Sequence, residues 1–315
     1  MKRKRMHSVR FLYYRILSHI TFGKTKKKYR DKYKSFRFGI IFSFNANDHS
    51  FTFKDLNGWE SRNISTMKLL ALALTRIRKQ LKHSFEVPVI TYDLAGEYPF
   101  KCLAYAKKDG QSNVTLIPDF FFDGWTTIGC NNYDLYMDEI VNNSHKAPIY
   151  DKCFWSGSLN IHPSRIHFFE MSKTDNRLKC LPINWKYEEL TPGKKLSKDT
   201  VTELKDFNQY KYLIDLPCIG YSGRFKALLF FGRPVFKVLS SPDEQLKEYF
   251  YDDLKPFVHF IPVNNDLSDL KEKLDWAENH YEDALKIAKN AQQYAITHLR
   301  TENAISYLEQ IIQRL

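Results

Sequence analysis

The second half of the chain alternates short apolar runs with segments of helical periodicity, and this alternation restricts the fold more than any other feature. The runs expected to form strands are Cys153–Trp155, Leu178–Pro182, Tyr212–Leu216, Pro234–Val238 and Val258–Pro262. The segments between them expected to form helices are Pro163–Met171, Thr200–Phe207, Ser222–Phe231 and Glu244–Phe250. Strands joined by single helices over short connections favour a parallel sheet. We therefore expect an α/β domain, closed by helices over Leu270–His280, Tyr281–Leu299 and Glu302–Leu315.

The first half shows the same alternation less regularly. Phe38–Phe44 is a β-rich apolar run, and Ile64–Leu81 carries apolar residues at the spacing of an amphipathic helix. Further strands are expected at Val87–Leu94, Leu103–Ala106 and Val114–Ile117. Because 315 residues exceed the roughly 100 to 200 of a typical domain, we expect two α/β domains, residues 38–148 and 149–315.

The positive charge of the chain is concentrated at one end. The formal net charge is +12, yet residues 1–37 carry 14 Lys and Arg against a single acid, Asp31. The remaining residues, 34 basic and 35 acidic, are close to neutral. Because this body offers no second basic surface, we expect no nucleic-acid partner.

Apolar and aromatic side chains lie among the basic residues of this N-terminal arm. Those that would share one face of a helix are Phe11, Leu12, Tyr14, Leu17 and Ile20. Arginines interrupt the apolar stretch, so it is neither a transmembrane helix nor a signal peptide. The pattern favours a helix on an anionic membrane surface, with a solvated tail as the alternative.

The five cysteines are odd in number, widely spaced and free of any C-x-x-C pair. Without a secretory signal, this usage indicates a reduced compartment. We expect a cytoplasmic protein, peripheral on the inner face of the cytoplasmic membrane through residues 1–37.

Several common sites are excluded by their missing motifs. No two of the 12 glycines are two positions apart, so there is no G-x-G-x-x-G dinucleotide loop, and there is no G-x-x-x-x-G-K-[ST] phosphate loop. The ten histidines include no H-x-H or H-E-x-x-H pattern, which makes a zinc site unexpected. The sequence also lacks any D-x-D pair, so a site for a sugar diphosphate would have to neutralise it without a metal ion.

A turn rich in Gly, Ser and Arg follows the expected strand Tyr212–Leu216. Pro217 ends the strand, Gly220 permits unusual backbone angles, and Ser222 is a good N-cap for the next helix. Such a helix start attracts phosphate through its backbone N–H groups, and Arg224 adds a planar charged fork. An ordinary capped helix with a surface arginine explains the same residues equally well.

Two further segments are weaker candidates. Phe154–Ser158, followed by Arg165, places hydroxyl and guanidinium groups after another expected strand. Pro118–Trp125 is rich in aromatics and would form either a wall for a sugar or part of the core.

Taken together, these segments resemble glycosyltransferase family 90, which includes protein O-glucosyltransferases, fungal capsule-associated xylosyltransferases and bacterial lipopolysaccharide glycosyltransferases. The likeness runs from about Pro88 to Arg300. The segments that carry it are Tyr210–Leu213, Ser222 with Arg224–Lys226, Pro234–Phe236, Leu254–Val263 and Asp266–Leu270. It implies the GT-B architecture, in which two Rossmann-like domains face a cleft, and an inverting reaction with a UDP-sugar donor and no essential metal.

The resemblance also implies donor-binding residues. The family's F-R-G-S turn corresponds to Phe154–Ser158, which gives Ser158 and, with one inserted residue, Arg165; Ser156 replaces the arginine of that turn. The family's donor loop corresponds to Ile219, Gly220, Tyr221, Ser222, Gly223 and Arg224, with Gly223 in place of Phe.

The family's catalytic base is an aspartate in an R-D-Y-P segment, which matches Gly96–Pro99 here. The resemblance therefore gives the role to Glu97, and Asp93 is the competitor. Asp119 and Asp123 are more distant candidates.

These observations lead to one expected function and one alternative. We expect a metal-independent hexosyltransferase that acts on a lipid-linked glycan acceptor, such as a lipopolysaccharide core or capsule intermediate of a bacterium. The alternative is a noncatalytic protein that binds polyanions or anionic membranes. Among enzymes, a phosphotransferase is the second choice, disfavoured by the missing phosphate loop.

Overall fold

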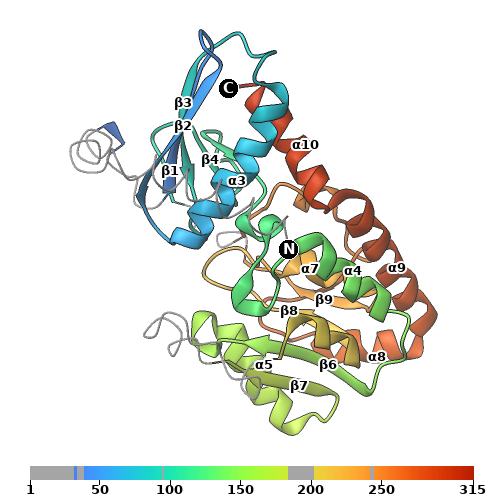
Figure 1. Ribbon diagram of the computed structural model, residues 1–315. Helices are drawn as coiled ribbons and strands as arrows, with labels where there is room; N and C mark the ends of the chain where they lie inside the picture. Colours follow the sequence, from blue (N-terminus) through green and yellow to red (C-terminus); the bar gives the residue numbers. More distant parts are fainter. Residues whose placement is uncertain (1–31, 34–38, 94–95, 184–201, 242–244) are drawn as a thin grey trace. The chain divides into compact units, whose positions relative to one another are not determined.

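The computed structural model describes residues 32–33, 39–93, 96–183, 202–241 and 245–315. The chain divides into two compact units, one formed by Met1–Phe120 with Ile305–Leu315 and the other by Phe121–Ala304. Figure 1 shows the elements of both, coloured along the sequence. The expected membrane-surface arm lies outside the described residues, apart from Lys32 and Tyr33. Within the described part, every helix is too short or too polar to cross a bilayer.

The first unit contains a five-stranded sheet in the order β2-β1-β3-β4-β5. The strands are β1 Gly39–Asn45, β2 Ser50–Asn57, β3 Phe85–Ile90, β4 Cys102–Ala104 and β5 Val114–Leu116. β1 is antiparallel to both β2 and β3, whereas β3, β4 and β5 are parallel. The long helix α3, Glu60–Ile77, connects β2 to β3.

This mixed sheet differs from the Rossmann-like domain that the sequence led us to expect. Strand β2 was not predicted, because its polar and aromatic residues alternate and do not form an apolar run. It folds back on β1 as a hairpin, and Phe53 stacks on Phe42 at 4.9 Å between ring centroids. Phe42 and Ile41 are fully buried, so β1 is the centre of this unit's core.

The second unit contains a wholly parallel sheet in the order β10-β9-β8-β6-β7. Its strands are β6 Tyr150–Gly157, β7 Leu178–Pro182, β8 Tyr210–Asp215, β9 Val235–Val238 and β10 Ile261–Val263. The prediction of five parallel strands from the apolar runs is confirmed. Such strands are buried on both faces, which is why they read as continuous apolar segments.

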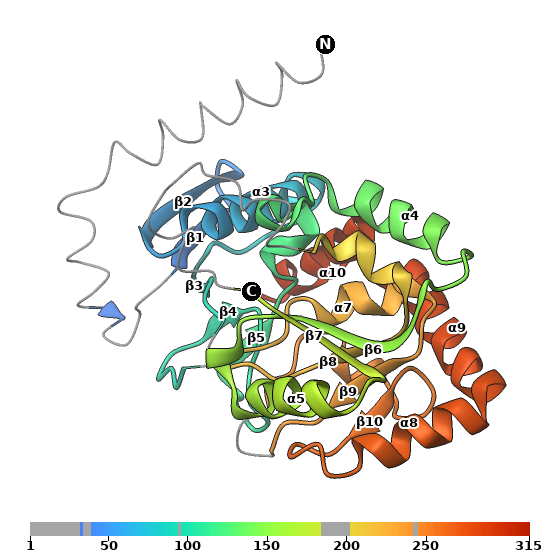
Figure 2. The same cartoon turned by 90° about the horizontal axis from the view of Figure 1, so that it is seen from below.

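Helices cover both faces of this parallel sheet. After α3, the α-helices of the described chain are α4 Tyr133–Asn143, α5 Pro163–Thr174, α7 Phe225–Leu228, α8 Leu270–Asn279, α9 Tyr281–His298 and α10 Thr301–Ile312. The short 3₁₀ helices are η1 Phe120–Asp123, η2 Thr126–Ile128, η3 Leu159–Ile161, η4 Leu204–Gln209, η5 Leu229–Phe231 and η6 Tyr251–Asp253. Phe168 of α5 and Leu274 of α8 share one core with Trp155 and Phe236 of the sheet. Figure 2 shows α5 and α8 on one side of the strands and α7 on the other.

Three expected helices differ from the structure. Of the helix expected over Thr200–Phe207, the described residues 202–207 contribute only to the 3₁₀ helix η4, which spans Leu204–Gln209. The described residues 245–250 contain no helix. The helix expected over Ser222–Phe231 is shortened to the four residues of α7, followed by η5. Gly232 ends this segment with φ of 60°, a left-handed conformation that favours glycine.

The division between the units also differs from the boundary expected at residue 148. Helix α4 groups with the second unit, where Asn208 Nδ2 donates to Ile140 O at 3.0 Å. Tyr133 packs edge-to-face on Phe230, with ring centroids 6.2 Å apart. The nearby Phe121 is fully buried, so the aromatic segment before α4 belongs to the core, which was one of its two interpretations.

Candidate functional site

The order of the parallel strands creates one distinctive place at the sheet edge. Counted across the sheet from β7, the strands are the second, first, third, fourth and fifth in chain order. The connection from β6 therefore leads to one side, to β7, whereas the connection from the neighbouring strand β8 leads to the other side, to β9. In doubly wound sheets, ligands bind beyond the carboxyl ends of the strands at such a switch point. The two segments there are those after β6 and after β8, and they contain all eight donor-binding residues named from the sequence.

Arg165 joins these two segments. It lies in the first turn of α5, where only 6% of the residue is exposed. Its Nε donates to Pro217 O at 2.7 Å, and its NH1 donates to Ser158 O at 3.1 Å. Burial lowers the pKa of Arg165 from its ordinary value. The guanidinium therefore ties the exit of β8 to the exit of β6 and brings a buried positive charge to the switch point.

Arg224, from the segment after β8, reaches the same place. Its NH1 donates to Ser156 O, and no acceptor for its buried Nε is found among the described residues. Burial lowers the pKa of Arg224 to about 10, so the side chain is still cationic at neutral pH. The guanidinium carbons of Arg224 and Arg165 lie 5.6 and 5.2 Å from the ring centroid of Trp155. Two cations thus converge on one buried indole.

Ser222 does not cap a helix as expected. The helix begins only at Phe225, and the residue at its N-cap, Arg224, makes no side-chain capping bond. The Ser222 hydroxyl instead donates to Asp215 Oδ1 at 2.6 Å. A buried carboxylate at the end of β8 outcompetes the capping geometry, because a hydrogen bond to a charged acceptor is stronger. The four-residue α7 therefore cannot supply the anion-binding helix start that we inferred.

Neither Gly220 nor Gly223 adopts a positive φ, so the expectation of unusual backbone angles at Gly220 is wrong. The turn is instead held by side chains that bond to its carbonyl groups. Cys218 Sγ donates to Gly220 O at 3.0 Å, and Lys226 Nζ donates to Gly223 O at 3.0 Å. Within the turn, Tyr221 is buried and Ile219 is exposed. These contacts fix the shape of the candidate donor loop.

Four charged residues of this site were missed from the sequence. Asp215 is 2% exposed, and Lys237 Nζ lies 3.3 Å from its Oδ2. Lys226 is fully buried and pairs with Glu248 Oε1 at 3.0 Å. A signal existed for Asp215, since a carboxylate at the carboxyl end of a buried strand lies at the ligand-binding edge of a parallel sheet.

The candidate bases lie in the first unit, beyond the carboxyl end of β3. Asp93 Oδ1 is 2.5 Å from Arg62 NH1, and the Arg62 guanidinium also lies over the Phe120 ring at 4.8 Å. Glu97 is exposed on the segment between β3 and β4. Asp119, the more distant candidate of this unit, is buried at 2% exposure. Asp123, in the second unit, is partly buried.

With this geometry in place, comparison with known families is decisive. The model of the family described as "Glycosyl transferase family 90" matches residues 87–315. The chain belongs to glycosyl transferase family 90. In this family 90 chain the match contains both proposed bases, Asp93 and Glu97, and all the candidate donor residues, whereas residues 1–86 lie outside it.

Curated relatives of this family 90 chain are protein O-glucosyltransferases. Protein O-glucosyltransferase 1 of Rattus norvegicus is 31% identical over 191 residues, which cover 58% of this chain and 47% of the rat protein. Protein O-glucosyltransferase 2 of Danio rerio is 30% identical over 186 residues, which cover 56% of this chain and 36% of the Danio rerio protein. The matched region thus spans about half or less of these relatives' length.

Solved structures show a weaker likeness to the family 90 chain. Anabaena Alr3699/HepE in complex with UDP-glucose is 11% identical, with a TM-score of 0.36 over 58% of this chain and 45% of that one. A glycosyltransferase from Rickettsia africae ESF-5 is 12% identical, with a TM-score of 0.35 over 57% of this chain and 43% of that one. Neither likeness is strong enough to define the fold.

Proposed function

We propose that this chain is an inverting glycosyltransferase that transfers a hexose from a UDP-sugar to a hydroxyl group of a glycan acceptor, without a metal ion. The observation that carries the proposal is the convergence of Arg165 and Arg224 on Trp155 at the switch point of the parallel sheet. Membership of a glycosyltransferase family supplies the reaction class. A diphosphate is the ligand group that two fixed guanidinium ions suit best.

In the proposed reaction, the acceptor oxygen forms a bond to the anomeric carbon as the bond from that carbon to the diphosphate oxygen breaks. The electron pair of the broken bond leaves with UDP, and the hydroxyl proton passes to Glu97, with Asp93 as the competing base. Attack from the face opposite the diphosphate inverts the anomeric configuration. General-base assistance of this kind contributes roughly 10² to 10⁴ in rate.

The leaving diphosphate gains negative charge in this reaction, and the second unit offers groups to stabilise it. Arg224 and Arg165 are preorganised by their bonds to Ser156 O and Pro217 O, so they need no reorganisation during the reaction. Ser158 and the turn Ile219–Gly223 complete the proposed donor site. Because the sequence has no D-x-D pair, we propose that these cations do the work of a divalent metal.

The names of the relatives indicate which donor and acceptor to test first. Those relatives are O-glucosyltransferases, so UDP-glucose is the first donor to try. A lipid-linked glycan at the cytoplasmic face of a membrane remains our proposed acceptor because of the basic arm in residues 1–37. A protein hydroxyl group is the second candidate, because those relatives are named for proteins as acceptors.

A panel of UDP-sugars, incubated singly with the protein, tests the proposal. We expect slow release of UDP from one of them, because transferases hydrolyse their own donor when water replaces the acceptor. The absence of hydrolysis, together with equal binding of UDP and other polyanions at physiological salt, would instead support the noncatalytic polyanion-binding alternative.

A further inference from the structure

The segment that carries the proposed base Glu97 has no regular secondary structure. Gly96–Pro99 lies between β3 and β4, and Glu97 is exposed. A general base must lie within hydrogen-bond reach of the hydroxyl group whose proton it removes, and a loop places a side chain less precisely than a helix or a strand does. Other residues must therefore hold this segment if Glu97 is to act as a base.

Two amide side chains hold the backbone on either side of Glu97. Gln111 Nε2 donates to Gly96 O at 3.0 Å, and Asn113 Nδ2 donates to Tyr98 O at 3.3 Å. Both amides come from the connection between β4 and β5. The carbonyl groups before and after Glu97 are thus tied to one short connection, and these bonds leave the Glu97 carboxylate available for proton transfer.

This connection is itself fixed by hydrogen bonds. Gln111 Oε1 accepts from Lys108 N at 2.8 Å, so the nitrogen of the amide is the atom that faces Gly96 O. Asn113 O accepts from Cys102 N at 2.9 Å, which joins Asn113 to the first residue of β4. Both amides are therefore attached to the sheet of the first unit.

The Tyr98 ring holds the same segment through packing. It lies on Phe100 with ring centroids 5.6 Å apart, and Phe100 packs edge-to-face on the buried Tyr33 at 4.9 Å. A β-carbon on Gly96 would lie 2.7 Å from the Tyr98 hydroxyl oxygen, so the ring lies against Gly96 and glycine leaves room for it. The turn around Glu97 is therefore compact.

We propose that Gln111 and Asn113 are positioning residues, which hold the backbone so that the Glu97 carboxylate meets the acceptor hydroxyl group. The inference rests on the proposed function, in which Glu97 is the base. Misplacement of a catalytic group by about 1 Å can cost roughly 10² in rate. Asp93, the competing base, pairs with Arg62, so a rate that depends on the two amides also favours Glu97 as the base.

A double-mutant cycle with Gln111→Met and Glu97→Gln tests the inference. Methionine has nearly the length of glutamine but cannot donate to Gly96 O. The measurement is the release of UDP from UDP-glucose, or from the UDP-sugar that the donor panel selects, with water in place of the acceptor. We expect Gln111→Met to lower kcat about tenfold in wild type but less than about twofold in Glu97→Gln, because placement no longer matters once the base is removed. The KM for the donor should not change.

Two further variants complete the experiment. Gln80→Met, an exposed change in the same unit, is the matched control and should keep the wild-type kcat. Asn113→Ala removes the bond to Tyr98 O at an exposed position, so it serves even if Gln111→Met does not fold. We expect a loss of about threefold, the scale of one neutral hydrogen bond, that again requires Glu97. An unchanged kcat in folded Asn113→Ala would refute the role given to Asn113.

The cycle separates this inference from the proposed function. Equal losses from Gln111→Met in wild type and in Glu97→Gln would show a structural role alone, which overturns the inference and leaves the proposed function intact. Wild-type activity of Glu97→Gln would remove Glu97 as the base, and the inference with it, while the transfer reaction stands. Failure of wild type to release UDP from any UDP-sugar would defeat the proposed function itself.

Discussion

The Ser222 hydroxyl donates a hydrogen bond of 2.6 Å to Asp215 Oδ1, which joins the candidate donor turn to the last residue of β8. Asp215 also faces Lys237 Nζ at 3.3 Å, and the Lys237 ammonium lies 3.8 Å from the ring centroid of Phe225. Asp215 thus bonds directly to Ser222 of the turn, and through Lys237 it is linked to Phe225, the residue that follows the turn. The shape of the turn is set by the sheet edge and not by a capped helix.

Asp215→Ala is expected to destabilise the protein, because it leaves the Lys237 charge and the Ser222 hydroxyl without their buried acceptor. The free energy of unfolding should fall by about 3 kcal/mol, as when one partner of a buried pair is removed. Urea denaturation measures this change. Asp252→Ala is the control, because the Asp252 side chain is 84% exposed and its ion pair with Lys247 contributes little. Equal effects of the two substitutions would contradict the role given to Asp215.

Glu97→Gln and Asp93→Asn, compared side by side, test the proposed base. We expect Glu97→Gln to slow transfer by roughly 10² to 10⁴. Asp93→Asn should have a smaller effect on the rate, because one Asp93 oxygen already pairs with Arg62. UDP affinity should be unchanged in both, since the two residues lie in the first unit and the donor residues in the second. If neither change slows transfer, both assignments are wrong.

Removal of divalent metals by a chelator should leave transfer unchanged. The proposed site neutralises the diphosphate with the guanidinium groups of Arg165 and Arg224. The measurement is the initial rate with and without chelator, with a known metal-dependent transferase in parallel to show that chelation is complete. Loss of activity that added metal restores would overturn the metal-free proposal.

Stability should depend on pH through Asp175, the C-cap residue of α5. Hydrogen bonds from the Arg177 side chain hold the pKa of Asp175 below its ordinary value. Because the pKa of Asp175 is lower in the folded than in the unfolded protein, the ion pair stabilises the folded state at pH values above the unfolded pKa of about 4. This stabilisation is lost as the pH falls through the folded-state pKa.

Asp175→Asn should therefore lower the free energy of unfolding by about 1 kcal/mol at neutral pH. The difference from wild type should shrink below about pH 4, as the wild-type carboxyl becomes protonated. Denaturation midpoints across this pH range provide the measurement. A difference that is the same at low and neutral pH would show that the charge of Asp175 is not its cause.

The parallel sheet could be predicted from the sequence because its strands are buried on both faces. Apolar runs such as Leu178–Pro182 coincide with the observed strand β7. By contrast, β2 is exposed in part and its alternating residues were overlooked. Helix α4 was also missed, although Asn132 is a suitable N-cap and accepts from Leu135 N at 3.0 Å. Weak patterns of this kind predict a strand or a helix only once the segments that pack against them are known.

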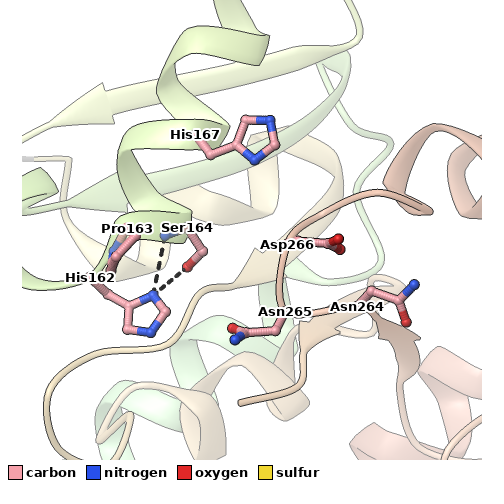
Figure 3. A pocket seen from close by; sticks show the side chains of 7 residues that line it. All are labelled: His162, Pro163, Ser164, His167, Asn264, Asn265 and Asp266. Atoms are coloured by element: carbon pink, nitrogen blue, oxygen red, sulfur yellow. Dashed lines mark hydrogen bonds between the residues drawn. The ribbon is translucent and has the colours of Figure 1, made fainter. Parts of the chain in front are cut away.

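The candidate site was predictable in its position but not in its bonding. Ser222 and Arg224 follow a buried strand, and strand ends of a parallel sheet meet at one edge. However, the contact of Arg165 with Pro217 O joins residues 52 positions apart, and no local pattern encodes it. A pocket between the start of α5 and the segment Asn264–Asp266 likewise combines two segments about 100 residues apart (Figure 3). Such contacts depend on strand order, which the sequence pattern does not specify.

The central claim is that Arg224, held at the ends of β6 and β8, binds the donor diphosphate. Titration of UDP into wild type, Arg224→Ala and the exposed control Arg314→Ala tests it most directly, with circular dichroism to confirm folding. We predict that wild type and Arg314→Ala bind UDP equally, and that Arg224→Ala loses at least about tenfold in affinity, the scale of a charged hydrogen bond. Undiminished UDP binding by folded Arg224→Ala would contradict the account.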